Sequence, residues 1–329
     1  MSFLSPTPDA LFFEGRKDDP RLGAWVKPRA KGLPPPDAFK KKKEILILYG
    51  AADDEGVHRN RGRRGAQGGP NGIRTHFYKM TPPMDVEWEN KIELWDFGNL
   101  IPAGEIAVTH DRAEEAARAI SAAGGTLIAL GGGHDFCAPH VKGFLEGQLE
   151  RKKKRPTFGI LNVDPHLDMR PMEDNGPHSG TPFRQLLDSG AIKGRNLVAF
   201  GTRANRNARE HFAYAKTQKV KVRPWEKLAA SKKGFVTEFG LELTTLSCQA
   251  DLFGVTIDLD SCCEAEGTSA APVLGFTAWD LCQMAYLAGK NKKVRFFEMA
   301  EAAPSLDFNE RIGRVGAEIL YFFLLGRAE

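Results

Sequence analysis

Three short segments of the sequence each end a hydrophobic run with side chains that can bind metal ions. They are GGGHD (131–135), NVDPHLD (162–168) and TIDLD (256–260). Many carboxylates with a few imidazoles suit Mn²⁺ or Mg²⁺ better than Zn²⁺, because these harder ions prefer oxygen ligands. Two such ions can bridge and activate a water molecule for hydrolysis. The three segments together therefore predict a two-metal hydrolase.

The spacing inside each segment can bring its polar side chains together. In an extended chain, residues i, i+2 and i+4 point to the same side, so Asp164, His166 and Asp168 can converge. The two aspartates of the third segment have the same relation. One such motif alone would be weak evidence, because a glycine-rich turn before a helix is common. Several buried carboxylates without cations would repel one another, and this disfavours a purely structural role for the set.

The elements that must position these segments are predicted strands that alternate with helices. Apolar runs predict strands at 45–49, 92–96, 127–130, 158–163, 197–201, 219–222, 254–257 and 294–298. Apolar residues at helical spacing predict helices at 111–123, 277–289 and 309–324, the second with a Thr277–Asp280 N-terminal cap. This alternation predicts an α/β fold with a parallel sheet. Ligands bind beyond the carboxyl ends of such strands, where all three segments fall.

Composition sets the limits of the prediction. The chain has 329 residues, of which 42% are hydrophobic, and shows no internal repeat or central linker. We expect a polar N-terminal lead-in, residues 1–43, packed on a single catalytic domain, residues 44–329. The net charge of +4 is spread along the chain and favours neither nucleic acid nor membrane binding. Five cysteines without a CxxC motif fit reduced thiols in a cytoplasmic protein.

Further motifs connect the segments to a known family. They are DEGVHRNRGRRGAQGGPNGIR (54–74), GTPF (180–183) and EMAEAAP (298–304). With them the chain, from about residue 45 to its end, resembles the ureohydrolase superfamily of arginase, agmatinase and formiminoglutamase. The family pattern is GG-x-H, D-A-H-x-D and D-x-D. The resemblance implies a three-layer arginase-like fold with a mostly parallel eight-stranded sheet, which agrees with the number of strands predicted above.

The resemblance also implies two Mn²⁺ ions per chain and assigns their ligands. One ion would be held by His134, Asp164, Asp168 and Asp258, and the other by His166, Asp164, Asp258 and Asp260. Four carboxylates balance the charge of two divalent cations. Glu301 matches the family carboxylate that holds the amidine-like group of the substrate. A carboxylate suits this role because a planar N–C–N cation offers two parallel hydrogen-bond donors.

The residues expected around the substrate favour formiminoglutamase within the family. Arg170 follows Asp168 by two residues, where arginases carry a neutral polar side chain. FGTRANRN (200–207) lacks the acidic residues with which arginases hold an ammonium group, and HSGTPF (178–183) resembles the formiminoglutamase form of its loop. The expected substrate-binding residues are Arg170, Ser179, Arg203, Asn205 and Arg206. Basic residues there suit a small anionic substrate derived from an amino acid. Each arginine could instead belong to a structural ion pair.

The resulting hypothesis is hydrolysis of N-formimino-L-glutamate to L-glutamate and formamide, a reaction of histidine degradation. A hydroxide bridging the metals would attack the formimino carbon, Glu301 would hold the amidinium group, and Asp168 would pass a proton to the departing nitrogen. His178 is a candidate proton shuttle, although the arginase histidine aligns better with Ser179. The resemblance further implies a homo-oligomer, either a trimer or a hexamer.

Two other functions stay open from the sequence. One is a guanidine hydrolase of the arginase or agmatinase type, which would release urea. The other is a non-catalytic metal-binding paralogue that acts through assembly. The chain also departs from the family pattern, with Pro165 in place of alanine and with Cys262 and Cys263 just after the last ligand. Either a redox influence or inert packing is open for these thiols, and packing is the simpler interpretation.

Overall fold

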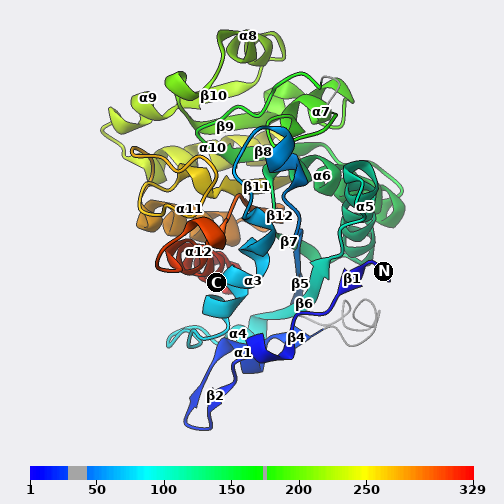
Figure 1. The fold of residues 1–329 in the computed structure, drawn as a ribbon, viewed down its shortest axis with the longest axis vertical. Helices are drawn as coiled ribbons and strands as arrows, with labels where there is room; N and C mark the ends of the chain where they lie inside the picture. Colours follow the sequence, from blue (N-terminus) through cyan, green and yellow to red (C-terminus); the bar gives the residue numbers. More distant parts are fainter. Residues whose placement is uncertain (29–42, 173–175) are drawn as a thin grey trace.

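The computed structural model describes residues 1–28, 43–172 and 176–329. All eight strands predicted from the sequence are present and lie side by side in one sheet (Figure 1). They are β5 (Glu44–Gly50), β6 (Ile92–Leu100), β7 (Thr126–Leu130), β8 (Phe158–Val163), β9 (Leu197–Thr202), β10 (Lys221–Pro224), β11 (Leu252–Asp258) and β12 (Val294–Ala300). Their order is β6-β5-β7-β12-β11-β8-β9-β10, and every neighbouring pair is parallel.

Within the described residues the sheet has ten strands rather than the eight expected, because the N-terminal segment adds two. β1 (Leu4–Ser5) pairs antiparallel with β6, and β4 (Lys27–Pro28) pairs parallel with it. Each is only two residues long, too short to leave a periodic pattern in the sequence. Between them, β2 (Gly15–Arg16) and β3 (Asp19–Pro20) pair with each other, and α1 (Leu22–Trp25) buries Leu22 in the core. Residues 29–42 of the expected lead-in lie outside the described part.

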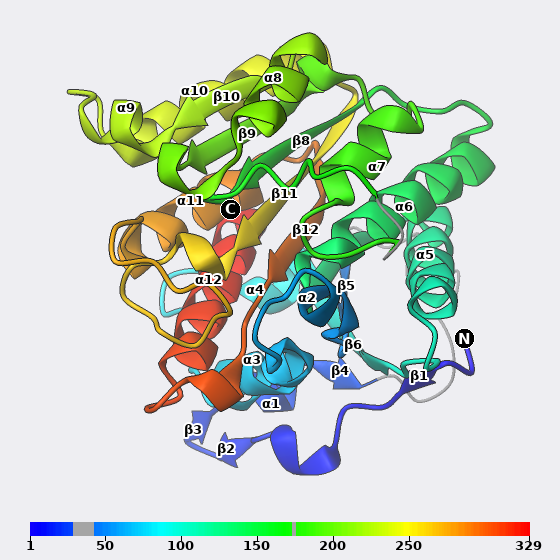
Figure 2. The same ribbon diagram turned by 45° about the horizontal axis from the view of Figure 1, so that its top comes forward.

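Helices cover both faces of the sheet, which gives three layers (Figure 2). Alternate residues of β5 show the division: Leu46 and Leu48 belong to one hydrophobic core, and Ile45 and Ile47 to the other. The first core includes residues of α3 (Gly69–Phe77), α10 (Phe235–Gln249), α11 (Ala278–Lys290) and α12 (Arg311–Ala328). The second includes residues of α5 (Ile106–Ala123), α6 (Cys137–Lys152) and α7 (Pro182–Asp188). Strands buried on both faces explain the continuously apolar runs in the sequence.

The three predicted helices are confirmed with shifted ends. Helix α11 begins after Thr277, whose hydroxyl accepts a hydrogen bond from the Asp280 N–H, while Asp280 accepts one from the Thr277 N–H. This reciprocal cap confirms the predicted start. Strand β10 begins two residues later than predicted, because Lys219 is left-handed (φ 63°) at the end of α8 (Arg209–Thr217). No helix in residues 1–28, 43–172 or 176–329 is both long and apolar enough to cross a membrane.

The sheet order explains how the three segments meet. Strands β7, β11 and β8, which precede them, lie within one run of the sheet, β7-β12-β11-β8. Because all four strands are parallel, their carboxyl ends share one edge. Short helices α2 (Glu55–Arg59), α4 (Trp88–Lys91) and α9 (Trp225–Ala229) complete the connections. The fold therefore brings together residues that are distant in the sequence, such as His134 and Thr256, which are 122 positions apart.

Candidate metal centre and substrate cavity

The six predicted metal ligands converge at the carboxyl edge of the sheet. The Nδ1 atom of His134 lies 3.0 Å from Asp168 Oδ2, 3.2 Å from Asp164 Oδ2 and 3.3 Å from Asp258 Oδ2. Beside this group, potential ligand atoms of His166, Asp258 and Asp260 lie within 4.8 Å of one another. The two groups share Asp258, as expected for a bridging carboxylate. Asp164 lies between them, because its Oδ1 atom is 3.4 Å from His166 Nδ1.

The residues fit a pair of divalent cations. The Nδ1 atom of His134 is buried and makes no hydrogen bond among the described residues, although three carboxylate oxygens surround it. Its other nitrogen, Nε2, is occupied by Thr256 Oγ1 at 3.0 Å. A buried imidazole nitrogen that faces several carboxylate oxygens is typical of a metal ligand. Four carboxylates would leave the pair of cations near electrical balance.

Without cations, the carboxylates disturb one another's ionisation. Burial and the charge of Asp164 raise the pKa of Asp168 to about 6. Burial, together with Asp164 and Asp260, raises the pKa of Asp258 well above its ordinary value. Burial alone would lower the pKa of His166, but the hydrogen bond and charge of Asp164 raise it to about 10. The metal-free site therefore retains protons that bound cations would displace.

These shifts predict that the stability of the metal-free protein falls as the pH rises, while the stabilisation by bound metal increases. Asp168 binds its proton more tightly in the folded than in the unfolded chain. Its stabilising contribution is therefore fully present below pH 3.8, the ordinary pKa of the group, and is lost as the pH rises through about 6. We expect the Tm of the metal-free protein to fall between about pH 5 and pH 7.5, and the stabilisation by Mn²⁺ to grow over the same range. Thermal melts with a chelator and with Mn²⁺ would measure both. A Mn²⁺ effect that is equal at both pH values would contradict this account.

Glu301 follows β12 and reaches the same place from the neighbouring strand. It is buried, and its Oε1 atom accepts a hydrogen bond from the backbone N–H of His134 at 3.0 Å. Burial and the charges of Asp258 and Asp260 raise its pKa. Glu301 and Asp168 both adopt the left-handed backbone region, with φ of 65° and 49°. Such conformations in non-glycine residues persist where the surrounding structure imposes them, often at functional sites.

A cavity of about 550 Å³ opens above these residues. Its floor contains carboxylates and one imidazole; they are His166, Asp168, Asp258, Asp260 and Glu301. Four of the five predicted substrate-binding residues line its wall; they are Arg170, Ser179, Asn205 and Arg206. The cavity therefore has a floor of buried or half-buried acidic residues and a rim of exposed residues, which are Arg61, Arg170, Asn205 and Arg206.

The fifth predicted substrate-binding residue, Arg203, does not line this cavity. Its Nε atom donates to Glu226 Oε1 at 2.9 Å, its Nη1 atom donates to the carbonyl of Leu274 at 2.7 Å, and its guanidinium lies over the ring of Trp225. The substrate-binding role expected for Arg203 is corrected to a structural ion pair. The 3-10 turn Ala204–Arg206 that follows directs Arg206, rather than Arg203, into the cavity wall.

His178, the expected proton shuttle, is not one of the described residues that line the cavity. Its Nδ1 atom accepts a hydrogen bond from the N–H of Gly180 at 3.1 Å, and its backbone N–H donates to Thr181 Oγ1. These bonds shape the loop that carries Ser179. His178 therefore contributes to the structure of this loop, and its role as a proton shuttle stays a prediction.

The cavity wall also contains residues that the sequence did not single out, among them Asn60, Arg61 and His211. Asn60 Nδ2 donates to Ser179 Oγ at 3.0 Å, which links two loops across the rim. Arg61 is left-handed (φ 64°), as Asp168 and Glu301 are at the same cavity. Arg61 lies in the glycine-rich segment 54–74, whose resemblance to the family was the available signal. This signal does not identify Arg61, because the segment contains several arginines.

The departures from the family pattern cause little disturbance. Pro165 lacks an N–H, yet its carbonyl accepts hydrogen bonds from the Arg203 N–H and from Asn207 Nδ2, both at 2.9 Å. All five cysteines are free. Burial raises the pKa of Cys262 to about 11, so its thiol stays protonated at neutral pH. Cys262 therefore fits inert packing better than a reactive thiolate.

Comparison with known proteins gives a consistent result. The sequence profile of the arginase family matches residues 45–326. Formimidoylglutamase of Halalkalibacterium halodurans is 32% identical over 202 residues, which are 61% of this chain and 60% of that protein. Formimidoylglutamase of Rhodococcus jostii is 30% identical over 286 residues, which are 84% of this chain and 83% of that protein. The crystal structure of Trypanosoma cruzi formiminoglutamase with two Mn²⁺ superposes with a TM-score of 0.80 at 28% identity, covering 94% of this chain and 99% of that one.

Proposed function

This chain belongs to the arginase family, and from that premise we propose that it hydrolyses N-formimino-L-glutamate to L-glutamate and formamide with two Mn²⁺ ions. The observation that carries the proposal is the division of the cavity into an acidic floor and a cationic rim. The substrate has a matching division, with a cationic formimino group at one end and two carboxylates at the other. Relatives named formimidoylglutamase support the same assignment.

The rim discriminates between the two substrate types of the family. Every carboxylate among the described residues that line the cavity belongs to the floor: Asp168, Asp258, Asp260 and Glu301. The α-ammonium group of arginine would therefore meet arginines rather than an acidic partner at the rim. N-formimino-L-glutamate has no free α-amine, and its carboxylates can pair with guanidinium groups. The geometry thus favours a formimino over a guanidino substrate.

The residues divide the chemical work between them. The metal pair would be held by His134, His166 and the four aspartates, and bound divalent cations would lower the pKa of a water molecule toward ~7. Glu301 binds the amidinium group, because it is a buried carboxylate oriented by the His134 N–H. Asp168 belongs to the acidic floor of the cavity, where it can pass a proton to the departing nitrogen.

A substrate panel with Mn²⁺-loaded protein would test the function. We expect formamide release from N-formimino-L-glutamate and no urea release from arginine or agmatine. Urea from a guanidino substrate, with no turnover of N-formimino-L-glutamate, would overturn the proposal. Metal analysis addresses the non-catalytic alternative, which predicts fewer than two Mn²⁺ per chain after reconstitution.

Arg206 and Arg203 offer a matched pair of variants for the rim. Arg206 lines the cavity, whereas Arg203, three residues earlier, is held by Glu226 outside it. We expect Arg206→Gln to raise KM for N-formimino-L-glutamate about 10- to 100-fold, as loss of a charge-assisted hydrogen bond of about 1.5–3 kcal/mol implies. Arg203→Gln should instead lower Tm and leave KM near wild type. Equal KM values for the two variants would show that the rim does not recognise the substrate as proposed.

The assembly and location of the protein complete the proposal. We infer from the family resemblance a homo-oligomer, a trimer or hexamer, in the cytoplasm. Sedimentation of the Mn²⁺-loaded protein would give the mass of the assembly, and a monomer at micromolar concentration would contradict the inference.

A further inference from the structure

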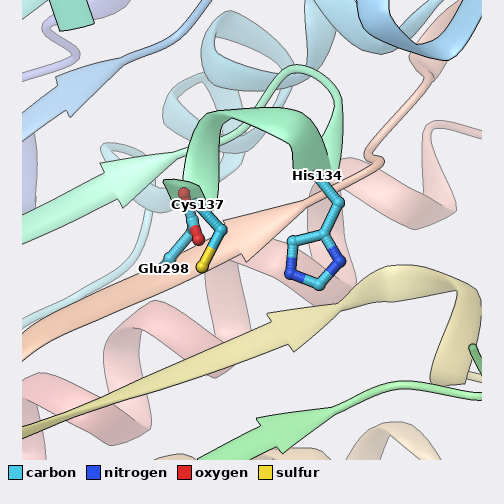
Figure 3. Close-up of side chains that lie close together, drawn as sticks. All are labelled: His134, Cys137 and Glu298. Carbon is cyan, nitrogen blue, oxygen red and sulfur yellow. The ribbon is translucent and has the colours of Figure 1, made fainter. Parts of the chain in front are cut away.

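His134 also belongs to a second group of buried polar side chains, with Cys137 and Glu298. Figure 3 shows the Cys137 sulfur beside the Glu298 carboxylate, both on one side of the His134 ring. Potential ligand atoms of these three residues lie within 4.8 Å of one another, and each residue is at most 1% exposed. Neither Cys137 nor Glu298 lines the substrate cavity. The group is therefore sealed from the substrate but adjacent to a metal ligand.

A hydrogen-bonded chain holds Glu298 in place. Its Oε1 atom lies 2.6 Å from Nδ1 of His140, and Nε2 of His140 bonds to the hydroxyl of Tyr49. Burial and the charge of Glu298 raise the pKa of Tyr49, so the phenol keeps its proton and donates it to Nε2. His140 then carries its own proton on Nδ1 and donates it to Glu298. These two hydrogen bonds hold the Glu298 carboxylate as an acceptor and stabilise its negative charge.

The remaining atoms of this group are suited to hydrogen bonding rather than to metal ligation. The Oε2 atom of Glu298 is buried and has no hydrogen bond among the described residues. The Cys137 thiol lies beside this carboxylate. A thiol in this position can donate its proton to the free Oε2 atom.

His134 needs a defined tautomer, and its hydrogen-bond partner alone does not select one. Nδ1 must be unprotonated to ligate a metal, which requires the ring proton on Nε2. Thr256 Oγ1, the partner of Nε2, is a hydroxyl that can either accept or donate. A buried negative charge on this side of the ring favours a proton on Nε2. Glu298 supplies that charge.

We propose that Glu298 is a positioning residue that, held by His140 and Tyr49, fixes the tautomer of His134 and so sets the affinity of the His134-side Mn²⁺ site. The inference concerns metal affinity and does not depend on which substrate the enzyme hydrolyses. Glu298 lies 158 residues from its hydrogen-bond partner His140 in the sequence. Glu298 lies on β12, His140 on α6 and Tyr49 on β5, so tertiary packing brings the three side chains together.

Glu298→Gln is the direct test, with Glu242→Gln as its control. Gln preserves the shape of the side chain and removes its charge. Glu242, on α10, is equally buried but pairs with Arg223 and Lys221 of β10. Mn²⁺ titration by calorimetry and electron paramagnetic resonance should show one of two sites weakened about 10- to 100-fold in Glu298→Gln, as expected for residues behind metal ligands. The second site, and both sites of Glu242→Gln, should keep wild-type affinity.

Two further variants complete the test. Glu298→Asp retains the charge and should recover part of the lost affinity, which a purely structural role would not predict. If Glu298→Gln does not fold, Tyr49→Phe carries the test, because it removes the donor at the far end of the chain. We expect it to weaken the same site by a smaller factor. Unchanged affinity at both sites in the folded variants, or equal weakening of both, would overturn the proposal.

Discussion

Replacing Asp258 by asparagine is expected to prevent formation of the Mn²⁺ pair and to lower kcat by well over 100-fold. Even residues behind metal ligands alter affinity or activity by about 10- to 100-fold, and Asp258 belongs to both ligand groups. A neutral amide cannot bridge two cations as a carboxylate does. Metal content after reconstitution and steady-state turnover of N-formimino-L-glutamate would measure the two losses.

The same substitution should raise the stability of the metal-free protein. Burial and the neighbouring aspartates raise the pKa of Asp258, which shows that its charged form is disfavoured in the empty site. A neutral amide in place of that carboxylate removes the repulsion, so we expect Asp258→Asn to have a higher Tm than wild type in chelator at about pH 7.5. In Mn²⁺ the order should reverse. A variant that loses activity but also unfolds in chelator would indicate a structural role instead.

Two control substitutions make this result specific. Asp260 belongs only to the group that contains His166, so Asp260→Asn should lose one ion and retain the other. The exposed Asp188 side chain pairs with Arg184 on α7, and Asp188→Asn should retain both ions and full turnover. Two tightly bound Mn²⁺ and normal turnover in Asp258→Asn would refute the assignment of Asp258 as the bridging ligand.

The strands and metal ligands could be predicted because their signals are local. A strand covered on both faces must be apolar along its length, and a ligand segment must follow directly at its end. The run 158–163 and the DPHLD that follows it contain both signals within a few residues. The two-residue strands β1 and β4 have no comparable signal, because their place in the sheet depends on pairing with β6.

The cavity rim could be predicted only in part, because it is formed by irregular turns. In a strand, the direction of a side chain follows from its position. Arg203 precedes a 3-10 turn and Arg206 is its last residue, and no such rule applies there. Tertiary partners decide the outcome: Glu226 and Leu274 hold Arg203 outside the cavity. The left-handed backbone of Arg61 depends in the same way on contacts that its own sequence does not reveal.

Glu301→Gln is expected to separate substrate binding from metal binding. The Gln side chain can still accept the hydrogen bond from the His134 N–H, so the metal ligands should remain in place. Unlike the Glu301 carboxylate, a Gln side chain has no negative charge and cannot accept both parallel N–H donors of the amidinium group. Loss of one charged partner from a buried pair costs about 2–5 kcal/mol, so we expect kcat/KM to fall by about 100-fold or more while two Mn²⁺ stay bound.

The conservative substitution Glu301→Asp tests the same residue from the other direction. It retains the charge but shortens the side chain, so the carboxylate cannot reach both the His134 N–H and the substrate. We expect Glu301→Asp to weaken Mn²⁺ binding on the His134 side as well as turnover. If Glu301→Gln were the variant that lost metal, Glu301 would be acting through His134 rather than on the amidinium. The two measurements together decide whether this carboxylate recognises the formimino group or only supports the metal centre beneath it.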